Sequence, residues 1–205
     1  MAIIHRYIDE LEALEQQHVF CGVPVSGHYN ILIIGTFNPS NASCAKQNNA
    51  SWFYGRKQNK FWRYLPTALT GTSLHENDYH TGQPASWRNY CINNKIIIID
   101  LVKQIETDDI LPNFGDRRVD NRINPDLSNA NFFSIKAAFQ GITFNKVLYS
   151  LKWADKKLEK LPKIRDKINQ ALIDNHCIER AGQIKYCHTP GRGNYPESWN
   201  GAVNQ

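Results

Sequence analysis

NILIIGTFNPS, residues 30–40, is the stretch that decides the fold. Its run Ile31–Ile34 is short, apolar and uninterrupted, which is typical of a strand buried on both faces of a parallel sheet. Gly35 then permits a close approach of the backbone, and Pro39 cannot extend a hydrogen-bonded ladder. In open parallel sheets, ligands bind outside the carboxyl ends of the strands. The turn at residues 35–40 is therefore expected to lie at a binding crevice.

Three later segments predict the other strands of the same sheet. Ile96–Ile99 is a second fully buried run, Thr143–Leu151 is the third strand, and the last strand begins at Ile184. Two buried strands separated by a helix favour a parallel sheet covered on both sides. The expected fold class is α/β, a three-layer α/β/α sandwich with a central, mainly parallel four-stranded sheet. Helices are predicted at residues 4–16, 59–69, 84–94, 131–139, 152–176 and 195–205, and a long loop at 104–130.

The 205 residues suit a single domain, 1–205, in which residues 1–29 form an N-terminal helix and a lead-in. The formal net charge of +5 permits an anionic partner without requiring one. No apolar stretch approaches the roughly 20 residues that span a bilayer, so we expect no membrane contact and a cytoplasmic monomer.

Metal and cofactor sites are not expected. The five cysteines are scattered and include no C-x-x-C pair, which argues against a structural zinc, an iron–sulfur cluster or a disulfide framework. His75 and His80 lack partners at the spacing of metal ligands.

Residues 52–63, WFYGRKQNKFWR, alternate aromatic rings with four cations and no acid. A solvated face would carry mixed charge, whereas flat rings and cations suit a stacked base and a phosphate backbone. Phe61 and Trp62 follow a good N-cap residue at helical spacing, which favours ordinary core anchors. For Phe53 and Tyr54, which precede that cap on a loop, core packing and ligand contact both stay open.

These motifs resemble those of the uracil-DNA glycosylase superfamily. Its mismatch-specific members have a G-x-N-P-G turn followed by H-P-x-N-x-F-W, and its hypoxanthine-DNA glycosylase branch has Y-Y-A-H-P-R-N-x-F-W. By this resemblance Asn38 corresponds to the asparagine of the turn, and Asn59 to the proposed catalytic asparagine before F-W. Arg56-Lys57 stands where the family has His-Pro, and Ser40 where it has a second glycine.

The resemblance also implies a base-binding set. Phe53 or Tyr54 corresponds to the ring that stacks on the flipped base. The turn between the first strand and the asparagine contributes the remaining members of that set, which are Gly35, Thr36 and Phe37.

Three further segments resemble the family, and one of them, residues 146–151, is similar to its third strand. Residues 95–102 are similar to its second strand and D-V-V/L turn, in which Asp100 is either a turn residue or a group near the site. Residues 184–194, IKYCHTPGRGN, resemble the last strand and the loop that enters the minor groove, with Gly191 where the family has serine. His188 is a candidate catalytic donor to the departing base, or a satisfied histidine at a strand end. The DNA-binding residues implied are Arg56, Lys57, Thr189, Gly191, Arg192 and Asn194.

The resemblance covers residues 30–200 and implies a monofunctional DNA glycosylase, which hydrolyses the N-glycosidic bond of a deaminated or mismatched base, uracil or hypoxanthine. Asn38 and Asn59 would position water and base, because an amide accepts and donates hydrogen bonds without ionising. Duplex or single-stranded DNA would be the partner, and no cofactor is needed. One alternative is a nucleic-acid or nucleotide-binding protein with the same fold and weak catalysis. Another is an unrelated α/β enzyme for a small anion.

Overall fold

A four-stranded sheet lies at the centre of the protein. The computed structural model describes residues 2–46, 50–56, 59–74, 84–107, 109–113, 115–150, 157–190 and 196–204. The sheet has the strand order β5-β4-β8-β9, and every neighbouring pair in it is parallel. All four predicted strands are confirmed. They are β4 (His28–Gly35), β5 (Ile96–Asp100), β8 (Thr143–Tyr149) and β9 (Ile184–Tyr186).

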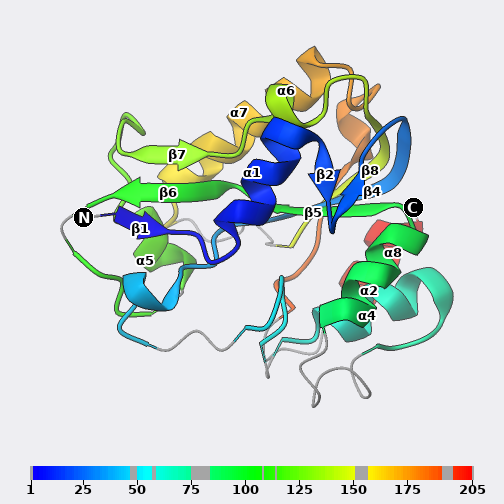
Figure 1. Ribbon diagram of the computed structural model, residues 1–205, viewed down its shortest axis with the longest axis horizontal. Coiled ribbons are helices and arrows are strands. Elements are labelled where there is room, and N and C mark those ends of the chain that lie inside the picture. Colours follow the sequence, from blue (N-terminus) through cyan, green and yellow to red (C-terminus); the bar gives the residue numbers. More distant parts are fainter. Residues whose placement is uncertain are drawn as a thin grey trace.

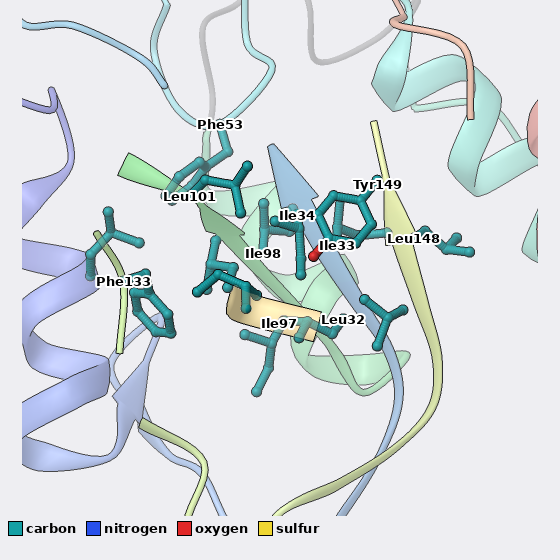
Figure 2. Packing of buried hydrophobic residues seen from close by; sticks show 14 of the residues in the cluster. Leu32, Ile33, Ile34, Phe53, Ile97, Ile98, Leu101, Phe133, Leu148 and Tyr149 are labelled. Carbon is teal, nitrogen blue, oxygen red and sulfur yellow. The ribbon is translucent and has the colours of Figure 1, made fainter. Parts of the chain in front are cut away.

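The strands β4 and β5 both contribute uninterrupted runs of buried apolar residues to the hydrophobic core, as their sequences predict. Ile33 is paired with Ile98 on one side and with Leu148 of β8 on the other. All three side chains are fully buried. Figure 2 shows them among the other core side chains of these strands. The carboxyl-terminal halves of β4 and β8 and the whole of β5 are therefore buried on both faces, which leaves the ends of these strands as the place where a ligand can approach.

Helices lie on either side of these strands. In Figure 1, α1, α6 and α7 lie above the strands, and α2, α4 and α8 lie below and to the right. This arrangement is consistent with a three-layer sandwich. None of the helices in the described part of the chain is long and apolar enough to cross a bilayer. The helices are α1 (Ile8–Gln17), α2 (Phe61–Thr70), α4 (Pro84–Asn93), α6 (Ile135–Ala138), α7 (Lys160–Asp174) and α8 (Pro196–Asn204).

A second, antiparallel sheet with the order β1-β6-β7 corrects the sequence interpretation. Residue 4, where a helix was expected to begin, belongs instead to β1 (Ala2–Ile4). The predicted loop 104–130 contains part of β6 (Val102–Glu106) and the short helix α5 (Asp116–Asp120), and β7 (Ala130–Phe132) replaces the first turn of the predicted helix at 131. These strands are short, and their stability comes from partners distant in sequence. Local periodicity therefore gives no signal for them.

Smaller elements complete the chain. The strands β2 (Val19–Phe20) and β3 (Val23–Pro24) form a two-stranded ribbon, and two 3-10 turns cover Asn41–Ser43 and Ala181–Gln183.

The carboxylate of Asp120 determines where α7 begins. It lies at the end of α5 with an exposed fraction of 1% and accepts the backbone N–H groups of Glu159, Lys160 and Leu161 at 3.1, 2.8 and 2.7 Å. A helix leaves its first N–H groups without partners, and an acceptor from another element satisfies them here. Pro162 consequently falls in the first turn, where proline is tolerated and does not kink the helix.

Candidate functional site

A cavity of about 140 Å³ opens at the carboxyl ends of β4, β5 and β8. Gly35, Asp100 and Ser150, which end or directly follow these three strands, all contribute to its wall. The volume is below the roughly 300–1,000 Å³ of sites for drug-sized ligands, so the cavity suits one planar ring system better than a whole nucleotide.

Asn38 lies on this wall and its side-chain orientation is determined by Arg56, which also lines the cavity. The Nη2 of Arg56 donates to the Oδ1 of Asn38 at 2.8 Å. Since a guanidinium only donates, the acceptor must be the amide oxygen. The backbone carbonyl of Asn38 accepts the N–H of Arg6 at 2.7 Å, which holds the turn against the N-terminal segment. Burial lowers the pKa of Arg56, and the nearby Asp100 carboxylate opposes that shift.

Asn59, from the loop before α2, lines the same cavity. Its Oδ1 accepts the backbone N–H of Phe61 at 2.9 Å, but the N-cap of α2 is Lys60 and not the predicted Asn59, and no side chain caps the helix at Lys60. The N–H of Lys60 donates to the carbonyl of Pro190 at 2.6 Å. This bond ties the loop after β9 to the start of α2 and accounts for the presence of Thr189 on the cavity wall.

Three rings also line the cavity: Phe37, Phe53 and Tyr54. Phe53 has an exposed fraction of only 1% and packs 5.0 Å from the ring of Tyr7, so it belongs to the core and to the cavity wall at once. Tyr54 stacks on Phe61 with 4.1 Å between ring centroids. The core-packing interpretation therefore holds for both loop rings, and their place on the cavity wall leaves the ligand-contact interpretation as a prediction.

The hydroxyl of Tyr54 donates to the Oγ of Ser150 at 2.6 Å. Burial raises the pKa of Tyr54 well above 10, and the Asp100 carboxylate raises it further. Tyr54 is thus a neutral donor at any ordinary pH, and its bond to Ser150 closes one side of the cavity.

The aromatic residues around the site are mostly core, as the helical spacing predicts. Trp62 is stacked between Trp52 and Trp87, with centroid distances of 5.7 and 5.2 Å. Its Nε1 donates to the carbonyl of Phe53 at 3.0 Å, so the indole stack holds the loop that carries the cavity rings. Phe61 and Trp62 have exposed fractions of 0% and 2%, which confirms them as core anchors.

Two carboxylates and one histidine also meet here: Asp100, which the sequence offered as a turn residue or a group near the site, and Asp116 and His5, which sequence reasoning missed. Asp116 of α5 lines the cavity and accepts the hydroxyl of Thr36 at 2.5 Å. Asp100 lines it as well, and its Oδ2 lies 2.7 Å from the Nε2 of His5, whose side chain is fully buried. Asp100 carried a signal, because it directly follows a buried strand. His5 and Asp116 carried no such signal, because His5 lies in a segment predicted as a helix (4–16) and Asp116 in a segment predicted as a loop (104–130).

Other predicted site residues lie elsewhere. His188, although described, is not among the residues that line the cavity: its N–H donates to Ser198 and its carbonyl accepts from Trp199. Within the described ranges, no cluster of three or more His, Cys, Asp or Glu residues could hold a metal ion. Several residues named above lie outside the described residues, namely Lys57, His75, His80, Gly191, Arg192 and Asn194.

Comparisons with models of protein families, with curated proteins and with solved structures give no match to this chain. The cavity and its residues are accordingly the basis on which a function can be inferred.

Proposed function

We propose that the protein is a monofunctional DNA glycosylase with a uracil-DNA glycosylase-like fold, which hydrolyses the N-glycosidic bond of uracil or hypoxanthine in DNA. The observation that carries this proposal is the convergence of Asn38 and Asn59, from separate segments, on one small ring-lined cavity at the carboxyl ends of a parallel sheet.

Base excision by hydrolysis does not require a covalent bond between the protein and the substrate. The base must leave the stack and enter a close-fitting pocket, and its departing negative charge must meet preorganised donors. Phe37, Phe53 and Tyr54 supply the flat apolar walls, and the two asparagine amides supply neutral polar contacts. Arg56 supplies a positive charge on the same wall, where it can stabilise the departing anion. DNA as the partner is also supported by the net charge of +5.

The test uses duplex and single-stranded oligonucleotides that carry one uracil or one hypoxanthine, followed by alkaline cleavage. We expect strand scission by the wild type, and a rate at least about 30-fold lower in Asn38→Ala and in Asn59→Ala, within the range typical of lost positioning and transition-state contacts. Asn30→Ala is the matched control, because Asn30 lies on β4 at the end away from the cavity, where its Nδ2 donates to the Asn94 carbonyl and its Oδ1 accepts from the Nδ2 of Asn145. Absence of scission from every substrate would refute the proposal.

A second candidate is a nucleic-acid or nucleotide-binding protein with weak catalysis. It is favoured by one observation: the Oδ1 of Asn38 and the Oδ1 of Asn59 each already accept a hydrogen bond from an obligate protein donor. Neither oxygen is therefore fully available to a water molecule. Salt-dependent binding of the same oligonucleotides without scission would identify this function.

A further inference from the structure

We propose that Asp100 takes the proton from the attacking water, and that His5 is the positioning residue that holds the Asp100 carboxylate in place. This inference rests on the proposed glycosylase function and assigns the base within the same cavity.

The hydrogen bonds of His5 determine its tautomer. The backbone N–H of Tyr7 donates to Nδ1 of His5 at 3.0 Å, so Nδ1 carries no proton. A neutral imidazole then carries its proton on Nε2, and that nitrogen lies 2.7 Å from Oδ2 of Asp100. His5 therefore donates a hydrogen bond to the carboxylate of Asp100. Such a bond can fix the orientation of a catalytic side chain.

The imidazole has little freedom to turn. Three aromatic rings surround it, with centroid distances of 5.9 Å to Tyr7, 5.6 Å to Phe37 and 5.9 Å to Phe53. The His5 backbone is held as well, because its N–H donates to the carbonyl of Lys103 at 2.9 Å and the residue forms an isolated bridge with Pro39. The end of β1 is thus bound both to β6 and to the turn that carries Asn38.

The second oxygen of Asp100, Oδ1, lies next to Gly35 at the cavity wall. Asp100 is opposite Gly35 in the β4–β5 register, and its Oδ1 lies over the Cα of that glycine. Both residues line the cavity, and Asp100 is only 5% exposed. With Oδ2 bound to His5, Oδ1 is the oxygen that can accept a hydrogen bond from water in the cavity.

The asparagines leave this role to a carboxylate. Both amide oxygens are engaged, as described above, and an amide does not accept a proton at ordinary pH. In the proposed step the water oxygen bonds to C1′ of the sugar while one water proton passes to Oδ1 of Asp100. The C1′–N bond breaks and its electron pair leaves with the base, which takes up a proton from solvent, and Asp100 then releases the proton it accepted to solvent. The products are the abasic sugar and the free base, so atoms and charge balance.

Two ring variants separate positioning from packing. His5→Phe keeps an aromatic ring among Tyr7, Phe37 and Phe53 and removes the donor, whereas His5→Gln keeps a neutral N–H donor and removes the ring. Single-turnover excision is measured with the full chain on the uracil and hypoxanthine duplexes. We expect Asp100→Asn to slow it at least about 100-fold, as for loss of a general base. We expect His5→Phe to slow it about 10- to 100-fold, as for loss of an orienting partner, with KM within about twofold of wild type.

The positioning role predicts that His5→Gln restores the rate to within about threefold of wild type, although it packs worse than His5→Phe. His28→Gln is the matched control, because His28 begins β4 at the end away from the cavity and bonds Thr143. The ring ¹⁵N shifts of His5, assigned by comparison with His5→Gln, should show a protonated Nε2 and a bare Nδ1.

The inference is overturned if Asp100→Asn keeps a rate within about threefold of wild type, if His5→Gln is no faster than His5→Phe, or if Nδ1 of His5 is protonated. If the wild type is active in these cases, the proposed glycosylase function is kept and only the roles of Asp100 and His5 are rejected. If the wild type itself excises neither base, the function and this inference fail together.

Discussion

Gly35 and Asp100 lie so close together that no side chain fits between them. A Cβ on Gly35 would be 1.9 Å from the Oδ1 of Asp100 and 2.7 Å from the hydroxyl oxygen of Tyr54, both shorter than the 3.0 Å below which real Cβ contacts essentially never fall. The glycine is therefore required by space at this position, which is the close approach that the sequence predicts for it.

Gly35→Ala should reduce the rate of excision more strongly than it reduces the stability of the fold. The methyl group must displace Asp100 or Tyr54, so we expect excision to fall at least about 100-fold and the free energy of unfolding to fall by about 1–3 kcal/mol, as for overpacking. Urea unfolding and single-turnover excision measure the two effects. Gly182→Ala is the control, since no atom lies within 4 Å of its Cβ, and it should be neutral or slightly stabilising. A fully active Gly35→Ala would show that the cavity tolerates a shift of the carboxylate.

Arg56→Met tests whether Arg56 acts on Asn38 or on the DNA backbone. Removing the 2.8 Å bond frees the Asn38 amide to rotate and removes the charge from the cavity wall, so we expect excision to fall about 10- to 100-fold. The salt dependence of oligonucleotide binding should stay that of the wild type. Arg63→Met, at an exposed position of α2, is the control and should keep the rate. If Arg56→Met instead keeps the rate and lowers the slope of log binding constant against log salt concentration by about one, Arg56 contacts a DNA phosphate.

Asp120→Ala should destabilise the fold without touching the cavity. It leaves three N–H groups at the start of α7 without their acceptor, and we expect a loss of about 2–4 kcal/mol in the free energy of unfolding. Thermal or urea unfolding measures it, and excision at low temperature should persist. The comparison is Asp166→Ala, which removes an exposed carboxylate bonded to its neighbour Arg165 and should cost less than about 0.5 kcal/mol. Equal losses in the two variants would contradict the capping role of Asp120.

The stability of the protein should fall in alkali. Burial raises the pKa of the Cys187 thiol from 9.0 to about 12. Above pH 9 the unfolded chain loses this proton while the folded chain keeps it, so the contribution is complete below pH 9 and is lost as pH rises towards 12, at up to about 1.4 kcal/mol per pH unit. Urea unfolding between pH 8 and 11 measures the slope. Cys187→Ala should have the shallower slope, and an unchanged slope would mean that the thiol titrates normally in the fold.

The sequence predicts the parallel sheet because the signal is local. The isoleucine runs of β4 and β5 identify strands buried on both faces, and the chain direction through the intervening helix sets their parallel pairing. Asn38 could be placed at the strand ends for the same reason. The resemblance to a known family identified Asn59 as a second candidate site residue. Asn38 and Asn59 both line the cavity.

The rest of the site could not be predicted because its contacts are long-range. His5 lies 95 residues from Asp100 in sequence and next to the helical periodicity of α1, which hides the short strand that directly precedes it. Asp116 lies 80 residues from Thr36, in a polar segment whose helix has only five residues. Periodicity cannot report a pairing that exists only once the two sheets have assembled.

The strand order has a consequence for the nascent chain. β4 leaves the ribosome before β5, β8 and β9, yet β5 and β8 pair on either side of it, and β9 adds only at the outer side of β8. A half-made chain therefore presents an unpaired strand edge, a known template for aggregation. The wall that Thr189 provides is missing until the ribosome has passed residue 189. Truncated products that end before β8 should consequently be prone to aggregation and should need chaperones. They should also lack a complete cavity.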